Sequence, residues 1–184
     1  QVSGRTAVIA WNWSLVMWGQ PPPCRAILDR LPADVIVMAD FERGGVKDLW
    51  RRPNWFIDEY SLGYAGPSEL CLQVFEAARA RGARVMSKLQ LGTTHELASV
   101  VSLPLMPSLF QKAAWHRAHD TAGFMGCWNF GNQLSANTAA FNYFLSADCP
   151  AGEDAALDRF AADYFPGCEA GALVKSWRRL MSAM

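Results

Sequence analysis

Carboxylates, tryptophans and other polar side chains follow the apolar segments of this chain. Cleavage of a glycosidic bond needs one carboxyl group as the acid and a second as base or nucleophile, and flat aromatic rings stack on sugar faces. These residue types therefore indicate chemistry on a carbohydrate. The candidates, in chain order, are Trp11, Trp13, Asp40, Glu42, Asp58, Glu59, Lys88, Gln90, Glu96, Trp128 and Asn129.

Most of these candidates also have a purely structural interpretation. Glu42 stands beside Arg43 and could form a surface ion pair, while Trp128 could belong to the core. Asp58 and Glu59 are adjacent, so only one of them can face a pocket if the segment is extended. Glu96 could cap a short helix, which leaves its role open. Lys88 lies inside an apolar segment, and a buried lysine must be paired or border a cleft, which favours a role in a site.

Other chemistries find little support in the sequence. His116 and His119 have a spacing that could suit a metal, but no third ligand is evident, so we expect no metal site and no cofactor. Phosphate loops, dinucleotide fingerprints and nucleophile elbows are not recognisable. The five cysteines are widely spaced without a CxxC pair and are interpreted as small buried hydrophobes.

The composition is that of a globular domain. Of the 184 residues, 51% are hydrophobic and 18% are charged, which excludes a disordered chain. Lysine plus arginine equals aspartate plus glutamate at 17 each, which argues against binding to nucleic acid or to an anionic membrane. No apolar run reaches the roughly 18 residues of a transmembrane helix. We expect one domain over residues 1–184.

Four strand-length apolar runs alternate with helical patterns. The strands are expected at residues 6–12, 34–40, 83–90 and 123–129, and their continuous apolar character predicts burial on both faces. Helices are expected at residues 24–31, 68–81, 109–119, 137–145, 153–165 and 170–184. This alternation predicts a parallel α/β fold, with βα units over about 6–145 and closing helices over about 153–183. The carboxyl ends of the strands would gather the candidate residues.

The segments at the strand ends also resemble a known group of proteins. They are WNWS, DFERGG, DEYSLGYAGPSE, KLQLGTTHEL, LPLMPSLFQK and GCWNFGNQLSAN. Together they resemble the C-terminal part of uncharacterised bacterial glycoside-hydrolase-like proteins. Those proteins have a (β/α)8 barrel distantly similar to β-hexosaminidase and α-glucuronidase-like barrels. The resemblance implies that the four strands correspond to strands five to eight, a half barrel. It also implies an extracytoplasmic bacterial location. The sugar pocket that it implies is lined by Glu42, Asp58 or Glu59, Lys88, Gln90, Glu96, Trp128 and Asn129.

The resemblance implies roles as well as a fold. Either Glu42 or Glu59 would donate the proton, with another carboxylate such as Asp58 assisting. Trp11, Trp13 and Trp128 would stack on the sugar, and Lys88 and Gln90 would bind its hydroxyls. In the related barrels the catalytic acidic pair lies on strand four, which this sequence does not contain. A homodimer or a separate N-terminal half-barrel would complete the sheet, because unpaired strand edges promote association.

Three alternatives stay open at this point. The chain could be a non-catalytic sugar-binding or assembly module with the same cleft. It could be an inactive barrel fragment that is stable only against a partner. It could also be a lyase that forms a Schiff base through Lys88.

Overall fold

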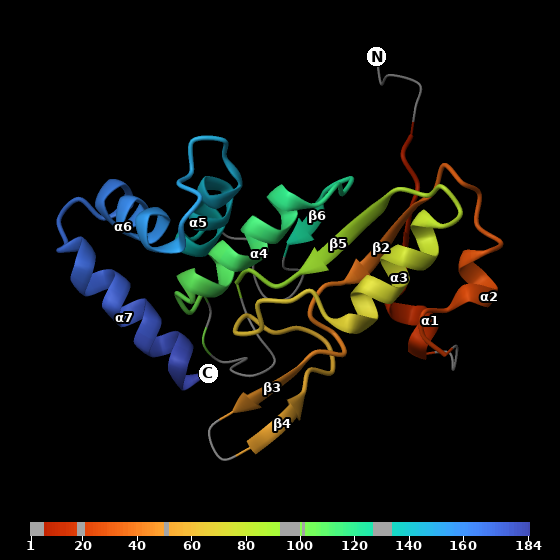
Figure 1. Ribbon diagram of the computed structural model, residues 1–184, viewed down its shortest axis with the longest axis horizontal. Helices are drawn as coiled ribbons and strands as arrows, with labels where there is room; N and C mark the ends of the chain where they lie inside the picture. Colours follow the sequence, from red (N-terminus) through yellow and green to blue (C-terminus); the bar gives the residue numbers. More distant parts are fainter. Residues whose placement is uncertain (1–5, 18–20, 50–51, 93–99, 101, 127–133) are drawn as a thin grey trace.

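A four-stranded parallel sheet organises the molecule. The computed structural model describes residues 6–17, 21–49, 52–92, 100, 102–126 and 134–184. The strands are β1 (Ile9–Trp11), β2 (Ile36–Asp40), β5 (Val85–Leu89) and β6 (Phe124–Gly126), hydrogen-bonded in that order (Figure 1). All three pairings are parallel. Each strand also lies beside the strand of this sheet that follows it along the chain. The predicted α/β class and the four strand positions are confirmed, although residues 127–129 of the last prediction lie outside the described part.

The two faces of the sheet carry different residues because side chains alternate along a strand. Val37 and Ala39 of β2, with Val85 and Leu89 of β5, belong to the main hydrophobic core. Asp40 is in register with Lys88, and this pair therefore points to the other face. The sheet thus has a mainly apolar face, on which Ser87 of β5 bonds to His116, and a face with charges at its carboxyl end.

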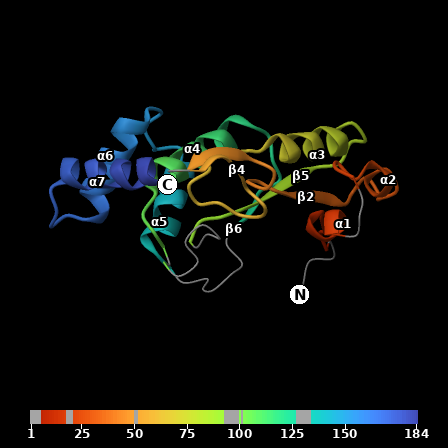
Figure 2. The same cartoon turned by 90° about the horizontal axis from the view of Figure 1, so that it is seen from below.

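Two helices cover the apolar face of the sheet. They are α3 (Glu69–Arg79) and α4 (Met106–Ala118), which lie on the same side of the strands (Figure 2). Ser68 caps α3 by accepting a hydrogen bond from the Cys71 backbone N–H at 3.1 Å. On α4, Ser108, Lys112 and His116 are buried at four-residue intervals, so they share one side of that helix. Polar groups on this buried stripe can reach the loops at the strand ends.

Three C-terminal helices extend the core beyond the sheet. They are α5 (Ala136–Leu145), α6 (Glu153–Tyr164) and α7 (Ala170–Ala183), at the left of Figure 1. Phe144, Phe160 and Trp177 join them through aromatic contacts, with ring centroids 5.6 Å apart for the first pair and 6.2 Å for the second. The predicted helices in this region are confirmed to within a few residues.

Three smaller elements complete the described structure. A β-hairpin, β3 (Val46–Leu49) and β4 (Arg52–Phe56), follows β2 and is antiparallel. The short helices are α1 (Trp13–Met17) and α2 (Arg25–Leu28). The hairpin and α1 were not among the predicted elements, whereas α2 lies within the helix expected at 24–31. Among the described residues, no helix is both long and apolar enough to cross a membrane.

Candidate functional site

The carboxyl ends of β1, β2 and β5 bring several of the predicted residues together. We call this group the strand-end cluster. Trp11 ends β1 and Asp40 ends β2, while Lys88 lies one residue before the end of β5. The loops after these strands supply the other members. The strand-end cluster consists of Trp11, Trp13, Asp40, Arg43, Glu59 and Lys88.

Asp40 is the central carboxylate of the cluster. Its Oδ1 accepts a hydrogen bond from Trp11 Nε1 at 2.8 Å, and its Oδ2 lies 3.7 Å from Arg43 Nη1. Burial raises the pKa of Asp40 to about 6, and the tryptophan N–H, Arg43 and Lys88 only partly oppose that effect. Burial outweighs these groups because a carboxylate loses much hydration in a dry site. Near neutral pH, Asp40 can therefore both hold and release a proton.

Two tryptophans form an aromatic pair beside Asp40. The ring centroids of Trp11 and Trp13 are 5.7 Å apart and the ring planes are inclined by 28°. Trp13 Nε1 donates to Glu59 Oε1 at 3.1 Å, so each indole N–H is held by a different carboxylate. Arg43 Nη1 also donates to the Trp13 carbonyl oxygen at 3.3 Å. These bonds fix the orientation of both rings, and both residues remain partly accessible.

Glu42 lies beneath the cluster in a buried ion pair. Lys112 Nζ of α4 donates to Glu42 Oε1 at 2.6 Å, and both side chains are inaccessible to solvent. The Gln90 backbone N–H donates to the same oxygen at 2.9 Å. Lys112 also donates to the carbonyl oxygens of Ser61 and Gln90. Burial raises the pKa of Glu42, while the Lys112 ammonium is the strongest opposing influence.

The pairing of Glu42 corrects one interpretation of the sequence. A surface ion pair between Glu42 and Arg43 is wrong, because Glu42 is buried against Lys112 and Arg43 pairs with Asp40. The oxygen Oε2 of Glu42 is buried and has no hydrogen-bond partner among the described residues. Glu42 thus ties β2 to α4 and the loop after β5.

Lys88 is completely buried, as its place in an apolar strand predicted. Its Nζ lies 4.3 Å from the centre of the Tyr60 ring, a cation–π contact. The charge of Lys88 lowers the pKa of both Asp40 and Glu42. Lys88 therefore acts electrostatically on the two neighbouring carboxyl groups, one in the cluster and one beneath it.

The remaining predicted residues differ in their surroundings. Asp58 is exposed, Glu59 is half-buried, and Gln90 is buried next to the Glu42–Lys112 pair. Glu96, Trp128 and Asn129 lie outside the described residues. Lys112, Tyr60 and Arg43 were not among the residues predicted for the site. The apolar surroundings of Lys112 within its predicted helix were the only available signal.

His116 has a structural environment. Its Nε2 lies 2.9 Å from Ser87 Oγ, and its ring packs against Phe41 with centroids 5.3 Å apart. Burial lowers the pKa of His116 to about 4, which keeps the ring neutral. His119, the exposed residue that directly follows α4, stacks on Trp115 with ring centroids 4.2 Å apart. In the described part of the chain, no three histidine, cysteine or acidic residues gather as metal ligands would.

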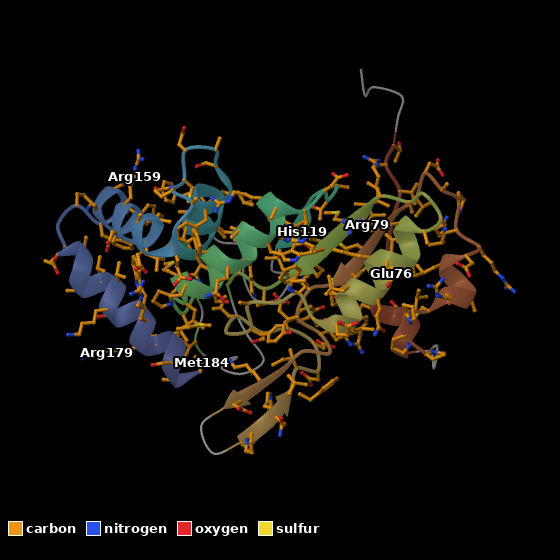
Figure 3. All side chains as sticks on the ribbon, in the orientation of Figure 1. Glu76, Arg79, His119, Arg159, Arg179 and Met184 are labelled. Atoms are coloured by element: carbon orange, nitrogen blue, oxygen red, sulfur yellow. The ribbon has the colours of Figure 1, made fainter. Side chains whose placement is uncertain are left out.

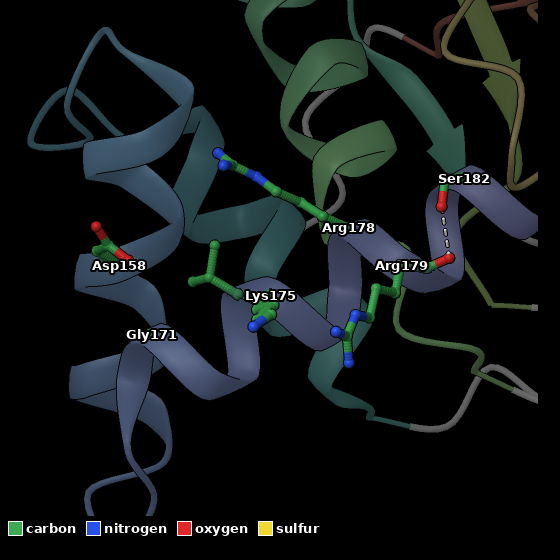
Figure 4. Close-up of a pocket in the computed structure, with 7 residues that line it drawn as sticks. Asp158, Gly171, Lys175, Arg178, Arg179 and Ser182 are labelled. Carbon is green, nitrogen blue, oxygen red and sulfur yellow. Dashed lines mark hydrogen bonds between the residues drawn. The ribbon is translucent and has the colours of Figure 1, made fainter.

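Two cavities lie away from the strand-end cluster. One of about 390 Å³ adjoins α7 and is lined by Asp158, Lys175, Arg178 and Arg179 among others (Figure 4). Another of about 510 Å³ lies near the start of β5, at the opposite end of the sheet. Charged side chains also extend from the outer helices, as Arg159 and Arg179 do in Figure 3. Neither cavity is lined by a residue of the strand-end cluster.

Comparison of the chain with models of protein families, with curated proteins and with solved structures gave no match. The geometry of the strand-end cluster therefore carries the functional argument.

Proposed function

We propose that the strand-end cluster is a carbohydrate-binding site, and that the chain forms part of a glycoside-hydrolase-like (β/α)8 barrel. The order of the sheet supports this architecture. In such barrels the strands are parallel and each is followed by a helix, with the site at their carboxyl ends. A doubly wound sheet would instead reverse its strand order at a switch point. The order β1-β2-β5-β6 contains no such reversal.

The oriented pair of Trp11 and Trp13 is the observation that carries the proposed function. Indole rings offer flat apolar faces that stack on the C–H faces of sugars. Here both indole N–H groups are held by carboxylates, Trp11 by Asp40 and Trp13 by Glu59. A sugar stacked on this pair would lie within reach of acidic groups that can accept hydrogen bonds from its hydroxyls.

We propose Asp40 as the proton donor for cleavage of a glycosidic bond. A general acid works best when its pKa lies near the working pH, and the pKa of Asp40 is about 6. Glu59 is the second carboxylate that the reaction requires. Glu42, expected from the sequence as a donor, is enclosed by Lys112 and the Gln90 N–H and serves in this proposal to position the loop. Asp58 is exposed and is the alternative to Glu59.

A second candidate function is sugar binding without cleavage. The observation that favours it is that Asp40 and Glu59 both already accept hydrogen bonds from tryptophan, which makes them supports for the aromatic pair. The Asp40→Asn variant separates the two functions. Under the hydrolase proposal it binds oligosaccharide but releases no product. If the wild-type chain binds and releases no product either, the binding module is the correct function.

Calorimetric titration with a panel of gluco-, xylo-, manno- and chito-oligosaccharides tests the site itself. We expect saturable binding of at least one member, weakened about tenfold or more in Trp13→Ala, equivalent to about 1.4 kcal/mol. The control is Tyr164→Ala, which removes an aromatic residue that is 47% exposed on α6. Loss of affinity in both variants alike, or no binding by the wild-type chain, would contradict the proposal.

The half-barrel part of the proposal concerns the open edges of the sheet. In the described residues β1 and β6 each pair on one side only, and Ile9 of β1 is 44% exposed. Unpaired strand edges favour pairing with another chain. We propose that a second copy or a separate half-barrel completes the sheet. Light scattering after size exclusion is expected to give a dimer mass for the isolated chain or aggregation, and a stable monomer would contradict this part.

A further inference from the structure

The β3–β4 hairpin exposes apolar and aromatic side chains in the segment that leads from β2 to Glu59 of the strand-end cluster. Val46 is paired with Phe56 across the two strands, and these side chains are 53% and 59% exposed. Trp55, opposite Lys47, is 37% exposed. Every residue of β4 is exposed, so the strand contributes nothing to the core. Because neighbouring residues of a strand point to opposite faces, the Val46–Phe56 pair and Trp55 expose apolar groups on the two faces of the hairpin.

The base of the hairpin is fixed to the strand-end loops. The Gly44 N–H donates to the Ile57 carbonyl and the Ile57 N–H donates to the Gly45 carbonyl, both at 2.8 Å. The Tyr64 ring lies directly against Gly45, where an added Cβ would come within 2.6 Å of it. A side chain at this position would push the ring away, so the close approach requires glycine. The hairpin is therefore an anchored extension of the site (Figure 1).

The chain connects the hairpin directly to the aromatic pair. After β4 it passes through the buried Ile57 to Glu59, whose Oε1 holds Trp13 Nε1. Trp55 and Glu59 are four residues apart, a span of at most about 14 Å. An oligosaccharide of a few rings is long enough to bridge any separation up to this limit, so an oligosaccharide is the ligand that suits both places.

Trp55 has the chemistry of a sugar platform. The Arg52 guanidinium lies 5.0 Å from the centre of its ring, a cation–π contact that restrains the indole. The ring supplies an apolar face, and the guanidinium supplies N–H donors for sugar hydroxyls. We propose that the hairpin is a distal subsite, centred on Trp55 and Arg52, for the outer residues of a longer carbohydrate chain. This inference rests on the proposed function and extends it to the length of the substrate.

Affinity measured as a function of oligosaccharide length tests the subsite. The probes are the disaccharide and the hexasaccharide of the series that the wild-type chain binds in the calorimetric panel. We expect the wild-type chain to bind the hexasaccharide at least tenfold more tightly than the disaccharide. Trp55→Ala is expected to remove most of that gain and to leave disaccharide affinity unchanged. Arg52→Ala, also on the exposed strand, is expected to have a smaller effect in the same direction.

The matched control is Leu72→Ala, which removes a side chain that is 40% exposed on α3, away from the hairpin. Thermal unfolding of each variant checks that the fold is retained. If Trp55→Ala binds the hexasaccharide as the wild-type chain does, or weakens both ligands equally, the distal subsite is refuted while the main site stands. If the wild-type chain binds no sugar, the proposed function fails and the inference falls with it.

Discussion

The raised pKa of Asp40 predicts a specific pH dependence of stability. The folded protein holds the proton of this carboxyl group up to a pH of about 6, whereas the unfolded chain releases it near 3.8, the ordinary pKa of an aspartate. The neutral form is therefore favoured by folding. The resulting stabilisation is fully present below pH 3.8 and is lost as the pH rises through about 6. Above that pH, folding must bury a charged Asp40.

The magnitude follows from the difference between the two pKa values. One pKa unit corresponds to 1.36 kcal/mol, so the shift of roughly two units amounts to about 3 kcal/mol of stability. Asparagine is neutral at every pH and keeps an oxygen that can accept the Trp11 N–H bond. The stability of Asp40→Asn relative to the wild-type chain is thus expected to increase by up to about 3 kcal/mol between pH 4 and pH 7.

Urea unfolding followed by circular dichroism at pH 4, 5, 6 and 7 measures this difference. Glu76→Gln, which removes an exposed carboxylate on α3, serves as the control for a simple change of net charge. A difference between Asp40→Asn and the wild-type chain that stays constant over this range would show that burial does not raise the pKa of Asp40. A difference that falls with rising pH would show that Arg43 and Lys88 outweigh burial.

Two other buried groups give further predictions. The pKa of His116 is lowered to about 4, so its neutral ring stabilises the fold above pH 6.5 and that contribution is lost as the pH falls to about 4. His116→Gln is expected to remove about 3 kcal/mol of this acid sensitivity, and an unchanged pH profile in urea titrations would contradict the assignment. Lys112→Met leaves the buried Glu42 carboxylate without its ammonium partner and is expected to cost about 3–5 kcal/mol at pH 7. Adding Glu42→Gln is expected to restore much of that loss, whereas additive losses in the double variant would contradict a direct pair.

The strands and longer helices were predictable because their buried faces produce local patterns of apolar residues in the sequence. Continuous apolar runs gave β2 and β5, and Ser68 with its following apolar period gave α3. The hairpin could not be predicted in this way. The strand β4 is exposed throughout and is held by pairing with β3, so no pattern of burial marks it, and Pro53 lies inside it. The helix α1 is only five residues long.

The contacts of the site depend on tertiary structure. The sequence predicted that Trp11, Asp40 and Lys88 lie close together, because the carboxyl ends of parallel strands meet at one edge of the sheet. The ion pair of Glu42 with Lys112 joins residues 70 positions apart and could not be read from spacing. The sequence also did not show that Asp40 and Glu42 have different partners. Asp40 bonds to Trp11 of the aromatic pair, whereas Glu42 is enclosed beneath the cluster with Lys112.

The most direct test of the sugar site is a titration with an oligosaccharide that binds in the calorimetric panel. The indole N–H signals of the tryptophans are followed by ¹⁵N NMR during this titration. Single Trp→Phe variants assign the signals. We expect the Trp11 and Trp13 indole signals to shift saturably, because both N–H groups belong to the proposed site. The signal of Trp177, buried among the C-terminal helices, is expected to stay in place. Shifts that spare Trp11 and Trp13, or an unchanged spectrum at saturating sugar, would contradict the account.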